Sequence, residues 1–188
     1  MHRGRLIVIA GPSGVGKGTI VRRLLARDPR RLALSVSATT RAPRPAEVDG
    51  IDYRFVSEED FDRMIADGEL LEWAEIVGHR SGTPRTFVDE QLAAGRDVVL
   101  EIDPNGAAQI RDRVPDPLLI FLMPPSMDEL ERRLRGRGTE DEEAIRGRLA
   151  AAERELEEAS WFDRVVVNDD AGRAADEVAA IIEASRTT

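Results

Sequence analysis

Residues 6–27 read LIVIAGPSGVGKGTIVRRLLAR. The first five residues are all apolar, which is typical of a strand that is covered on both faces of a sheet. From residue 17 onward the apolar side chains recur at the spacing of an amphipathic helix. A glycine-rich turn ending in a lysine joins the two, and this order of strand, turn and helix predicts a phosphate-binding P-loop. The loop comprises Gly11, Pro12, Ser13, Gly14, Val15, Gly16, Lys17, Gly18 and Thr19.

Each part of this loop has a physical role. Its glycines let successive backbone N–H groups turn toward one anion, and the helix that follows adds the positive end of its dipole. The flexible, charged side chain of Lys17 can reach the outer phosphates of a nucleoside triphosphate. Gly18 stands where serine or threonine usually holds Mg²⁺, and Thr19 follows it. A plain glycine-rich turn is the alternative, and the motif by itself does not identify a phosphoryl acceptor.

The bulk composition excludes several classes of protein. With 188 residues, 41% of them hydrophobic, the chain is long enough for one compact domain. Its net charge of −9 argues against general binding of nucleic acid, which favours a basic surface. No apolar run approaches the roughly 20 residues that span a bilayer, and we find no export signal. The sequence has no cysteine, which excludes disulfides and fits the reducing cytoplasm, where we expect the protein to act.

Three further apolar runs, at 98–102, 118–123 and 164–168, alternate with helical patterns such as those that begin at Ser126 and Arg173. Strands that alternate with helices predict an α/β fold, in which helices cover the two faces of a parallel sheet. This core would comprise residues 1–33, 87–125 and 160–188.

Two segments interrupt the alternation. Residues 34–86 contain short strand-like pieces (LSVSA, YRFV and LLEWAEI) around one helix from Ser57 to Asp67, and they indicate an inserted lobe with a mixed or antiparallel sheet. Residues 126–159 are dense in charge and have few large apolar side chains, as in a helical lid. We call these segments the acceptor lobe and the lid.

The acceptor lobe also carries a family resemblance. Its stretch SVSATTRAPRPAEVDGIDYRFV (35–56) is similar to the nucleotide-acceptor lobe of guanylate kinases. The likeness continues in family order through GELLEWAEIVG (68–78), SGT (81–83), EIDPNGA (101–107), RRLRGRGTEDEEAIRGRL (132–149) and VND (167–169). It implies a P-loop NTPase-type α/β fold and reversible transfer of the γ-phosphoryl group of ATP to GMP, with Mg²⁺ as cofactor.

The resemblance implies how GMP is held. Arg41 and Arg44 would bind the GMP phosphate together with Tyr53, and guanidinium groups suit bidentate contacts with phosphate oxygens. Glu72 would accept from the two donors on the Watson–Crick edge of guanine, with Ser37 and Thr83 beside the base. The alternatives are a basic surface loop stiffened by proline for the arginines and an exposed strand carboxylate for Glu72.

The same resemblance covers the strand end and the donor side. Asp103 would lie near Mg²⁺, through water, and near the acceptor, and Glu101 stands where many relatives carry aspartate. Asn168 would lie beside the adenine of ATP. Acids that merely end a strand, and an Asn-Asp turn after one, are the alternatives.

In the lid, Arg135, Arg137 and Arg148 match family positions that close over the phosphates, and with Lys17 and Arg41 they form the expected catalytic set. The lid arginines at 132, 133, 146 and 154 fit salt bridges along the helices instead.

One position departs from the family. Many relatives carry a phosphate-binding tyrosine directly before the Gly82-Thr83 pair, where this chain has Ser81, preceded by Arg80. Arg80 either replaces the missing phenol or points to solvent.

Two other functions remain open from the sequence. The chain could be a non-catalytic guanylate-kinase-like interaction module, although such modules usually lack the P-loop lysine that is present here. It could also be a kinase of this fold that acts on another nucleotide or on a phosphorylated sugar. The sequence does not indicate an oligomeric state.

Overall fold

The computed structural model describes residues 3–45, 47–76, 78–136 and 142–186. Its larger sheet has five parallel strands in the order β2-β7-β1-β8-β9. They are β1 (Leu6–Ala10), β2 (Leu32–Leu34), β7 (Asp97–Glu101), β8 (Leu118–Met123) and β9 (Arg164–Val167). The four apolar runs all form strands of this sheet, so the predicted parallel α/β fold is confirmed.

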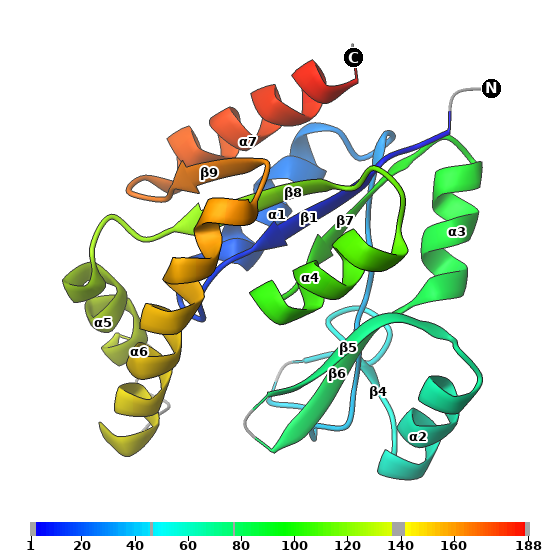
Figure 1. The fold of residues 1–188 in the computed structure, drawn as a ribbon, viewed down its shortest axis with the longest axis horizontal. Helices are drawn as coiled ribbons and strands as arrows, with labels where there is room; N and C mark the ends of the chain where they lie inside the picture. The colour runs from blue at the N-terminus through cyan, green and yellow to red at the C-terminus, as the bar shows by residue number, and fades with distance from the viewer. Residues whose placement is uncertain (1–2, 46, 77, 137–141, 187–188) are drawn as a thin grey trace.

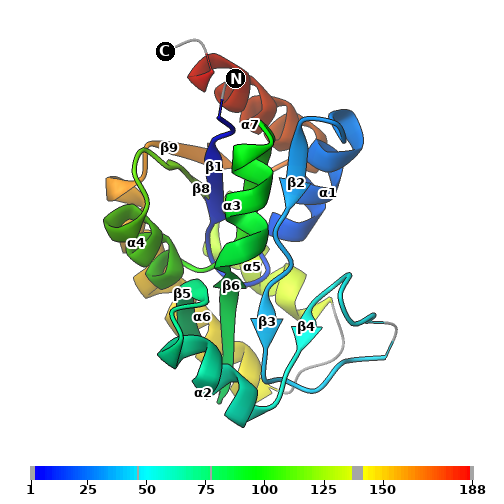
Figure 2. The same ribbon diagram turned by 90° about the vertical axis from the view of Figure 1, so that its right-hand side faces the viewer.

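Helices cover both faces of this sheet (Figures 1 and 2). On β1, Ile7 and Ile9 point to one face, where they pack with α1 (Lys17–Arg27) and α7 (Ala171–Ser185). Leu6 and Val8 point to the other face, toward α3 (Arg85–Ala93) and α4 (Pro104–Arg113). Side chains of a strand alternate between faces, and here both faces are apolar because both are buried. Among the described residues, no helix is long and apolar enough to cross a membrane.

A smaller, mixed sheet has the order β4-β3-β6-β5. Its strands are β3 (Ala38–Thr39), β4 (Arg54–Phe55), β5 (Leu70–Ile76) and β6 (His79–Pro84), and α2 (Glu58–Ala66) packs against them through Phe61 and Met64. The strand-like piece LSVSA is divided between the sheets: Leu34 pairs with Val99 of β7, and Ala38 pairs with Gly82 of β6. One strand of the larger sheet, β2, was therefore missing from the sequence-based prediction.

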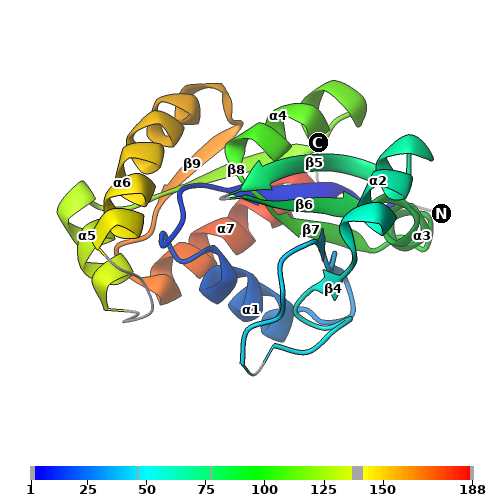
Figure 3. The same cartoon turned by 90° about the horizontal axis from the view of Figure 1, so that it is seen from below.

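The remaining helices are α5 (Met127–Arg135) and α6 (Glu142–Glu157), followed by the short η1 (Glu158–Trp161). Ser126 caps α5, accepting from the backbone N–H of Glu129 at 3.2 Å as predicted. A small cluster around Leu130, Leu134 and Ala152 joins the two helices. Figures 1 and 3 show this pair and the smaller sheet on the same side of the larger sheet, as separate projections.

Candidate active site

The loop between β1 and α1 depends on glycine at residues 11, 14 and 16, which all have positive φ angles. Gly14 and Gly16 have φ angles of 89° and 103°, in the left-handed region that other residues rarely adopt. A Cβ at Gly16 would also lie 2.5 Å from the side-chain nitrogen Nδ2 of Asn168. The loop backbone therefore approaches the end of β9 closely, and Gly16 is the N-cap of α1.

Lys17 is the first residue of α1. Its Nζ donates to the carbonyl oxygens of Gly11, at 2.6 Å, and Pro12, at 3.2 Å, so the ammonium group lies over the loop. Glu101, at the end of β7, lies near Gly18 in the first turn of α1. A Cβ at Gly18 would be 3.4 Å from Oε2 of Glu101 and 3.5 Å from Oε1. The glycine leaves room for this carboxylate beside the loop.

Two side chains, Asn168 and Arg133, hold the loop through hydrogen bonds to backbone carbonyl oxygens. Asn168 is buried, and its Nδ2 donates to the carbonyl oxygen of Val15 at 2.7 Å. Arg133 of α5 donates to the same carbonyl at 3.2 Å and to the carbonyl oxygen of Asn168 at 3.0 Å. Its Nε donates to Glu129 at 2.8 Å. One guanidinium group thus joins α5, the loop and the end of β9.

The helix α6 brings two ionisable side chains to the loop side of the site. Arg148 donates to the hydroxyl of Ser13 at 2.6 Å. Glu155, two helical turns later on the same face, is half-buried. Burial raises the pKa of Glu155, while the charge of Lys17 lowers it and that of Asp103 raises it again. Glu155 was not predicted, because nothing in the lid sequence distinguishes it from its acidic neighbours.

On the smaller sheet, Arg41 lies against two aromatic rings. Its guanidinium carbon is 5.2 Å from the ring centre of Tyr53 and 5.8 Å from that of Phe55. Nη2 of Arg41 donates to Glu47 at 2.9 Å, and the backbone N–H of Arg44 donates to the other oxygen of Glu47 at 2.7 Å. The ion pair with Glu47 raises the pKa of Arg41. Arg41, Arg44 and Tyr53 thus lie together.

Glu72 of β5 is buried, with 3% of its surface exposed. Its Oε1 accepts from the hydroxyl of Thr83 at 2.6 Å, and a Cβ at Gly106 would lie 2.6 Å from Oε2. Burial raises the pKa of Glu72 to about 7, and the nearby charge of Asp103 contributes in the same direction. The alternative of an exposed strand carboxylate is therefore wrong.

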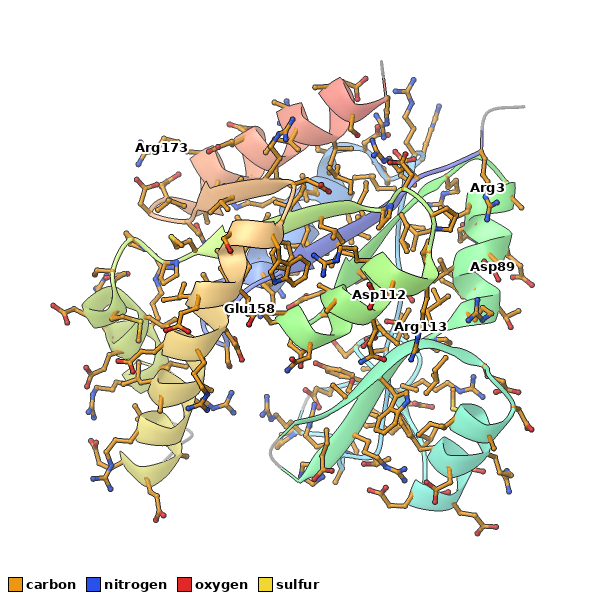
Figure 4. The ribbon with its side chains drawn as sticks, viewed as in Figure 1. Arg3, Asp89, Asp112, Arg113, Glu158 and Arg173 are labelled. Atoms are coloured by element: carbon orange, nitrogen blue, oxygen red, sulfur yellow. The ribbon has the colours of Figure 1, made fainter. Side chains whose placement is uncertain are left out.

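The helix α4 holds β5 on both sides of Glu72. Nε2 of Gln109 donates to the carbonyl oxygen of Trp73 at 2.7 Å, and its Oε1 accepts from the backbone N–H of Trp73 at 3.3 Å. Arg113, labelled in Figure 4, donates to the carbonyl oxygen of Leu71 at 3.1 Å. The same helix begins at Asp103, whose Oδ1 accepts from the backbone N–H of Gly106 at 2.7 Å. One rigid element therefore connects Asp103 to Glu72.

The comparisons with known proteins agree with this arrangement. A family model described as guanylate kinase matches residues 3–185. The chain belongs to the guanylate kinase family. It is 52% identical to a guanylate kinase of Symbiobacterium thermophilum over 98% of this chain and 87% of the relative, and 59% identical to one of Thermosynechococcus vestitus over 89% and 87%. A crystal structure of guanylate kinase from Anaplasma phagocytophilum matches with a TM-score of 0.83 and 33% identity, covering 100% of this chain and 89% of that one.

Membership of the guanylate kinase family also identifies the reaction that the chain catalyses. The chain is an ATP-dependent kinase that phosphorylates GMP. The predicted family and enzyme class are thereby confirmed, and an interaction module without activity is not supported.

The predicted lid arginines have different partners in this structure. Arg148 lies at the loop as expected. Arg135 pairs with Glu131 of α5 and Glu142 of α6, and Arg137 lies outside the described residues. Arg133, predicted to form only a helical salt bridge, also contacts the loop. Its i,i+4 spacing from Glu129 gave the simpler explanation, and the contacts with residues 15 and 168 have no sequence signal.

The departure at residues 80 and 81 is explained by the direction of the strand. Arg80 pairs with Glu58 and Asp62 of α2, and its guanidinium carbon lies 4.9 Å from the ring centre of Phe61. The hydroxyl of Ser81 donates to the carbonyl oxygen of Ala38 at 3.3 Å. Adjacent strand residues face opposite sides, and these contacts hold Arg80 against α2, which favours the alternative in which it does not replace the missing tyrosine.

Three further predicted residues lie near β3, on β6 and in α1. Ser37 is half-buried just before β3, and its carbonyl oxygen accepts from the backbone N–H of Arg54 at 2.9 Å. A Cβ at Gly82 would lie 2.8 Å from the carbonyl oxygen of Glu72, so a larger residue would push β5 and β6 apart. Thr19 accepts from Arg22 at 3.3 Å.

Proposed function

We propose that this chain carries out transfer from ATP to GMP at the site between the β1–α1 loop and the smaller sheet. Glu101 is the observation that carries the proposal, because it connects the two halves. Its carboxylate lies beside Gly18 of the loop, and on the smaller sheet burial raises the pKa of Tyr53, with the charge of Glu101 contributing in the same direction. A donor phosphate on the loop and an acceptor phosphate at Tyr53 would therefore be neighbours.

ATP would bind on the loop. Backbone N–H groups of the loop and the N-terminus of α1 would face its phosphates, and Lys17 would exchange its loop carbonyls for phosphate oxygens. Asn168 would lie beside the adenine. Arg148, already at Ser13, would contact the phosphates from the lid. We keep Arg137 in this group on its family position, and we assign Arg135 to the lid surface.

GMP would bind on the smaller sheet. Arg41, Arg44 and Tyr53 would hold its phosphate, and Glu72 would accept from the N1–H and the amino group of guanine. Ser37, Ser81, Gly82 and Thr83 would line the base, with Thr83 keeping Glu72 in place. Arg41 touches the acceptor phosphate and therefore belongs with the catalytic residues.

The transfer itself needs positioning and neutralisation of charge more than proton transfer. An oxygen of the GMP phosphate forms a bond to the γ-phosphorus, the bond to the β-phosphate oxygen breaks, and ADP leaves with the electron pair. Lys17, Arg41 and Arg148 would neutralise the charge that spreads over the transferred group.

Magnesium fits the side chains present, held mainly by phosphates and water. Gly18 offers no hydroxyl ligand, and within the described residues no group of three His, Cys, Asp or Glu side chains is arranged to hold a metal ion. Glu101 supplies oxygens beside the loop, and Asp103 would contribute through water, as Mg²⁺ usually keeps several water ligands. When bound, the ion would neutralise phosphate charge and orient the donor.

The two inserted segments would move relative to the core. Residues 34–86 would act as the acceptor lobe and residues 126–159 as the lid of one domain, both closing toward the core residues when substrates bind. We expect the protein to act in the cytoplasm without binding nucleic acid.

The test is an ADP-release assay with ATP and Mg²⁺ across GMP, AMP, CMP and UMP. We expect turnover with GMP and at least a hundredfold preference over AMP, because a site built to pair with a base's donors rejects the base that lacks them. Turnover with a different nucleotide would indicate another acceptor. No turnover with any of the four would contradict the proposed roles.

A further inference from the structure

Glu47 uses both oxygens of its carboxylate on the two arginines assigned to the acceptor phosphate. Oε1 accepts from Nη2 of Arg41 at 2.9 Å, and Oε2 accepts from the backbone N–H of Arg44 at 2.7 Å. In return, the backbone N–H of Glu47 donates to the carbonyl oxygen of Arg44 at 3.1 Å. The carboxylate therefore fixes the side chain of one arginine and the backbone of the other.

This contact is partly removed from water. The side chains of Arg41 and Glu47 are 19% and 18% exposed, far less than most ion pairs of this chain. Donation from Arg41 and Arg44 lowers the pKa of Glu47, so the carboxylate stays charged near neutral pH. With Tyr53 and Phe55 on its other side, the guanidinium of Arg41 is held between two rings and one carboxylate.

We propose that Glu47 is a positioning residue for the acceptor phosphate, which holds Arg41 and Arg44 at the spacing that a phosphate dianion requires. The inference rests on the proposed function, because it deepens the assignment of the GMP site. Glu47 does not contact GMP itself; it acts through the two arginines.

The need for such a residue follows from what this chain lacks. Ser81 stands where a phenol would bind the same phosphate, and Arg80 is directed to Glu58 and Asp62 instead. The phosphate is left with Arg41, Arg44 and Tyr53. When few donors bind an anion, the placement of each donor matters more, since an arginine free to rotate loses entropy on binding.

Substitution of Glu47 by glutamine separates positioning from simple charge, because the two effects have opposite signs. As a negative charge beside the phosphate, Glu47 repels it, so neutralisation alone would tighten GMP binding. As a positioning residue it needs two acceptor oxygens. Glutamine offers one, and its NH₂ group would face a donor of Arg41 or Arg44, which would displace one arginine. Positioning therefore predicts weaker binding despite the lost repulsion.

The experiment measures dissociation constants for GMP and for guanosine, together with KM for GMP and ATP. For Glu47→Gln we expect about tenfold weaker GMP binding, the scale of one charged hydrogen bond. Guanosine has no phosphate, so its affinity should stay within twofold, as should KM for ATP. Glu47→Asp keeps both oxygens on a shorter side chain, and it should lose less than the glutamine variant. Guanosine binding also reports that the smaller sheet is folded.

Two further variants complete the design. Glu58→Gln removes a carboxylate from another arginine pair on the same sheet, and it should leave GMP affinity unchanged. Arg41→Ala tests the proposed function itself and should weaken GMP binding. If Arg41→Ala does so and Glu47→Gln leaves GMP affinity equal or tighter, the positioning inference is overturned alone. An equal loss of guanosine binding in Glu47→Gln would also overturn it. If Arg41→Ala has no effect, the acceptor site itself is wrongly assigned.

Discussion

The hydroxyl of Thr83 donates a hydrogen bond of 2.6 Å to Oε1 of Glu72, and both side chains are buried. The hydrogen bond favours the charged carboxylate, but burial outweighs it and raises the pKa of Glu72 to about 7. Glu72, which we propose recognises the base, is therefore only partly ionised at neutral pH before GMP binds. Its protonated form cannot accept from both donors of guanine.

Affinity for the guanine base should fall as the pH decreases through about 7. With a pKa of about 7, roughly one site in eleven is ionised at pH 6 and roughly ten in eleven at pH 8. We expect the dissociation constant of guanosine to be about tenfold larger at pH 6, measured by calorimetry. Guanosine is preferred because the phosphate of GMP titrates in this range. Identical affinity at the two pH values would show that Glu72 is ionised throughout.

The same pKa predicts a gain in stability when Glu72 is replaced by glutamine. The folded protein binds a proton more tightly than the unfolded chain, whose carboxyl titrates near 4.5. Between these values folding takes up a proton, so the free energy of unfolding decreases as the pH rises from about 4.5 to 7. Glutamine has no such loss, so at pH 8 Glu72→Gln should raise the free energy of unfolding by up to about 3 kcal/mol and unfold at a higher temperature.

This gain in the free energy of unfolding should vanish near pH 4, where the carboxyl of Glu72 is mostly protonated in both the folded and the unfolded chain. Thermal melts at pH 4, 6 and 8 measure the trend, and a difference that does not grow with pH would contradict it. The same variant should lose its preference for GMP over AMP, since the amide presents a donor to a guanine donor.

The sequence predicted the elements whose patterns are local. β1 and β8 match their apolar runs to the residue, and α1 matches its helical pattern. β2 was missed because three residues, LAL, carry no periodicity, and its strand character comes from pairing with β7. Glu72 and Thr83 were named through the family resemblance alone, because an alternating strand pattern by itself favours an exposed carboxylate.

Contacts between distant segments were the least predictable part of the site. The direction of Arg80 depends on where α2 packs, and the contacts of Arg133 depend on how β9 ends. Both arginines have acidic neighbours at short range in sequence or space, so charge patterns alone cannot rank the possible partners. Glu155 was missed for the same reason.

Arg80→Ala should leave KM for GMP unchanged within twofold. The guanidinium lies on α2 with Glu58 and Asp62, so its removal does not affect the phosphate site. Its partners Glu58 and Asp62 are exposed to solvent, so the loss of stability should be small. Steady-state kinetics and a thermal melt measure both. A tenfold rise in KM for GMP would mean that Arg80 turns inward when GMP binds.

Lys17→Ala should lower kcat by about 10²–10³ while the fold persists. The lysine is proposed to neutralise phosphate charge in the transition state, and removal of one such group has this scale. Its bonds to the carbonyl oxygens of Gly11 and Pro12 are replaceable by water, so the melting temperature should change little. Wild-type turnover in a folded variant would contradict the assignment of the loop.

Arg133→Ala should raise KM for ATP and leave KM for GMP unchanged, and Arg132→Ala is its matched control. Both arginines pair with Glu129, so each substitution removes the same charge from the same helix and the same partner. Only Arg133 also donates to the carbonyl oxygens of Val15 and Asn168. A difference between the two variants therefore measures the bonds to the loop.

Loss of a charged hydrogen bond to a carbonyl costs about 1.5 kcal/mol or more, so we expect Arg133→Ala to raise KM for ATP at least tenfold. Arg133→Lys keeps the charge, but one ammonium group cannot reproduce a fork that spans two carbonyls, and it should recover little of the loss. Equal kinetics for Arg132→Ala and Arg133→Ala would mean that Asn168, through its own 2.7 Å bond to Val15, holds the loop without help from the lid.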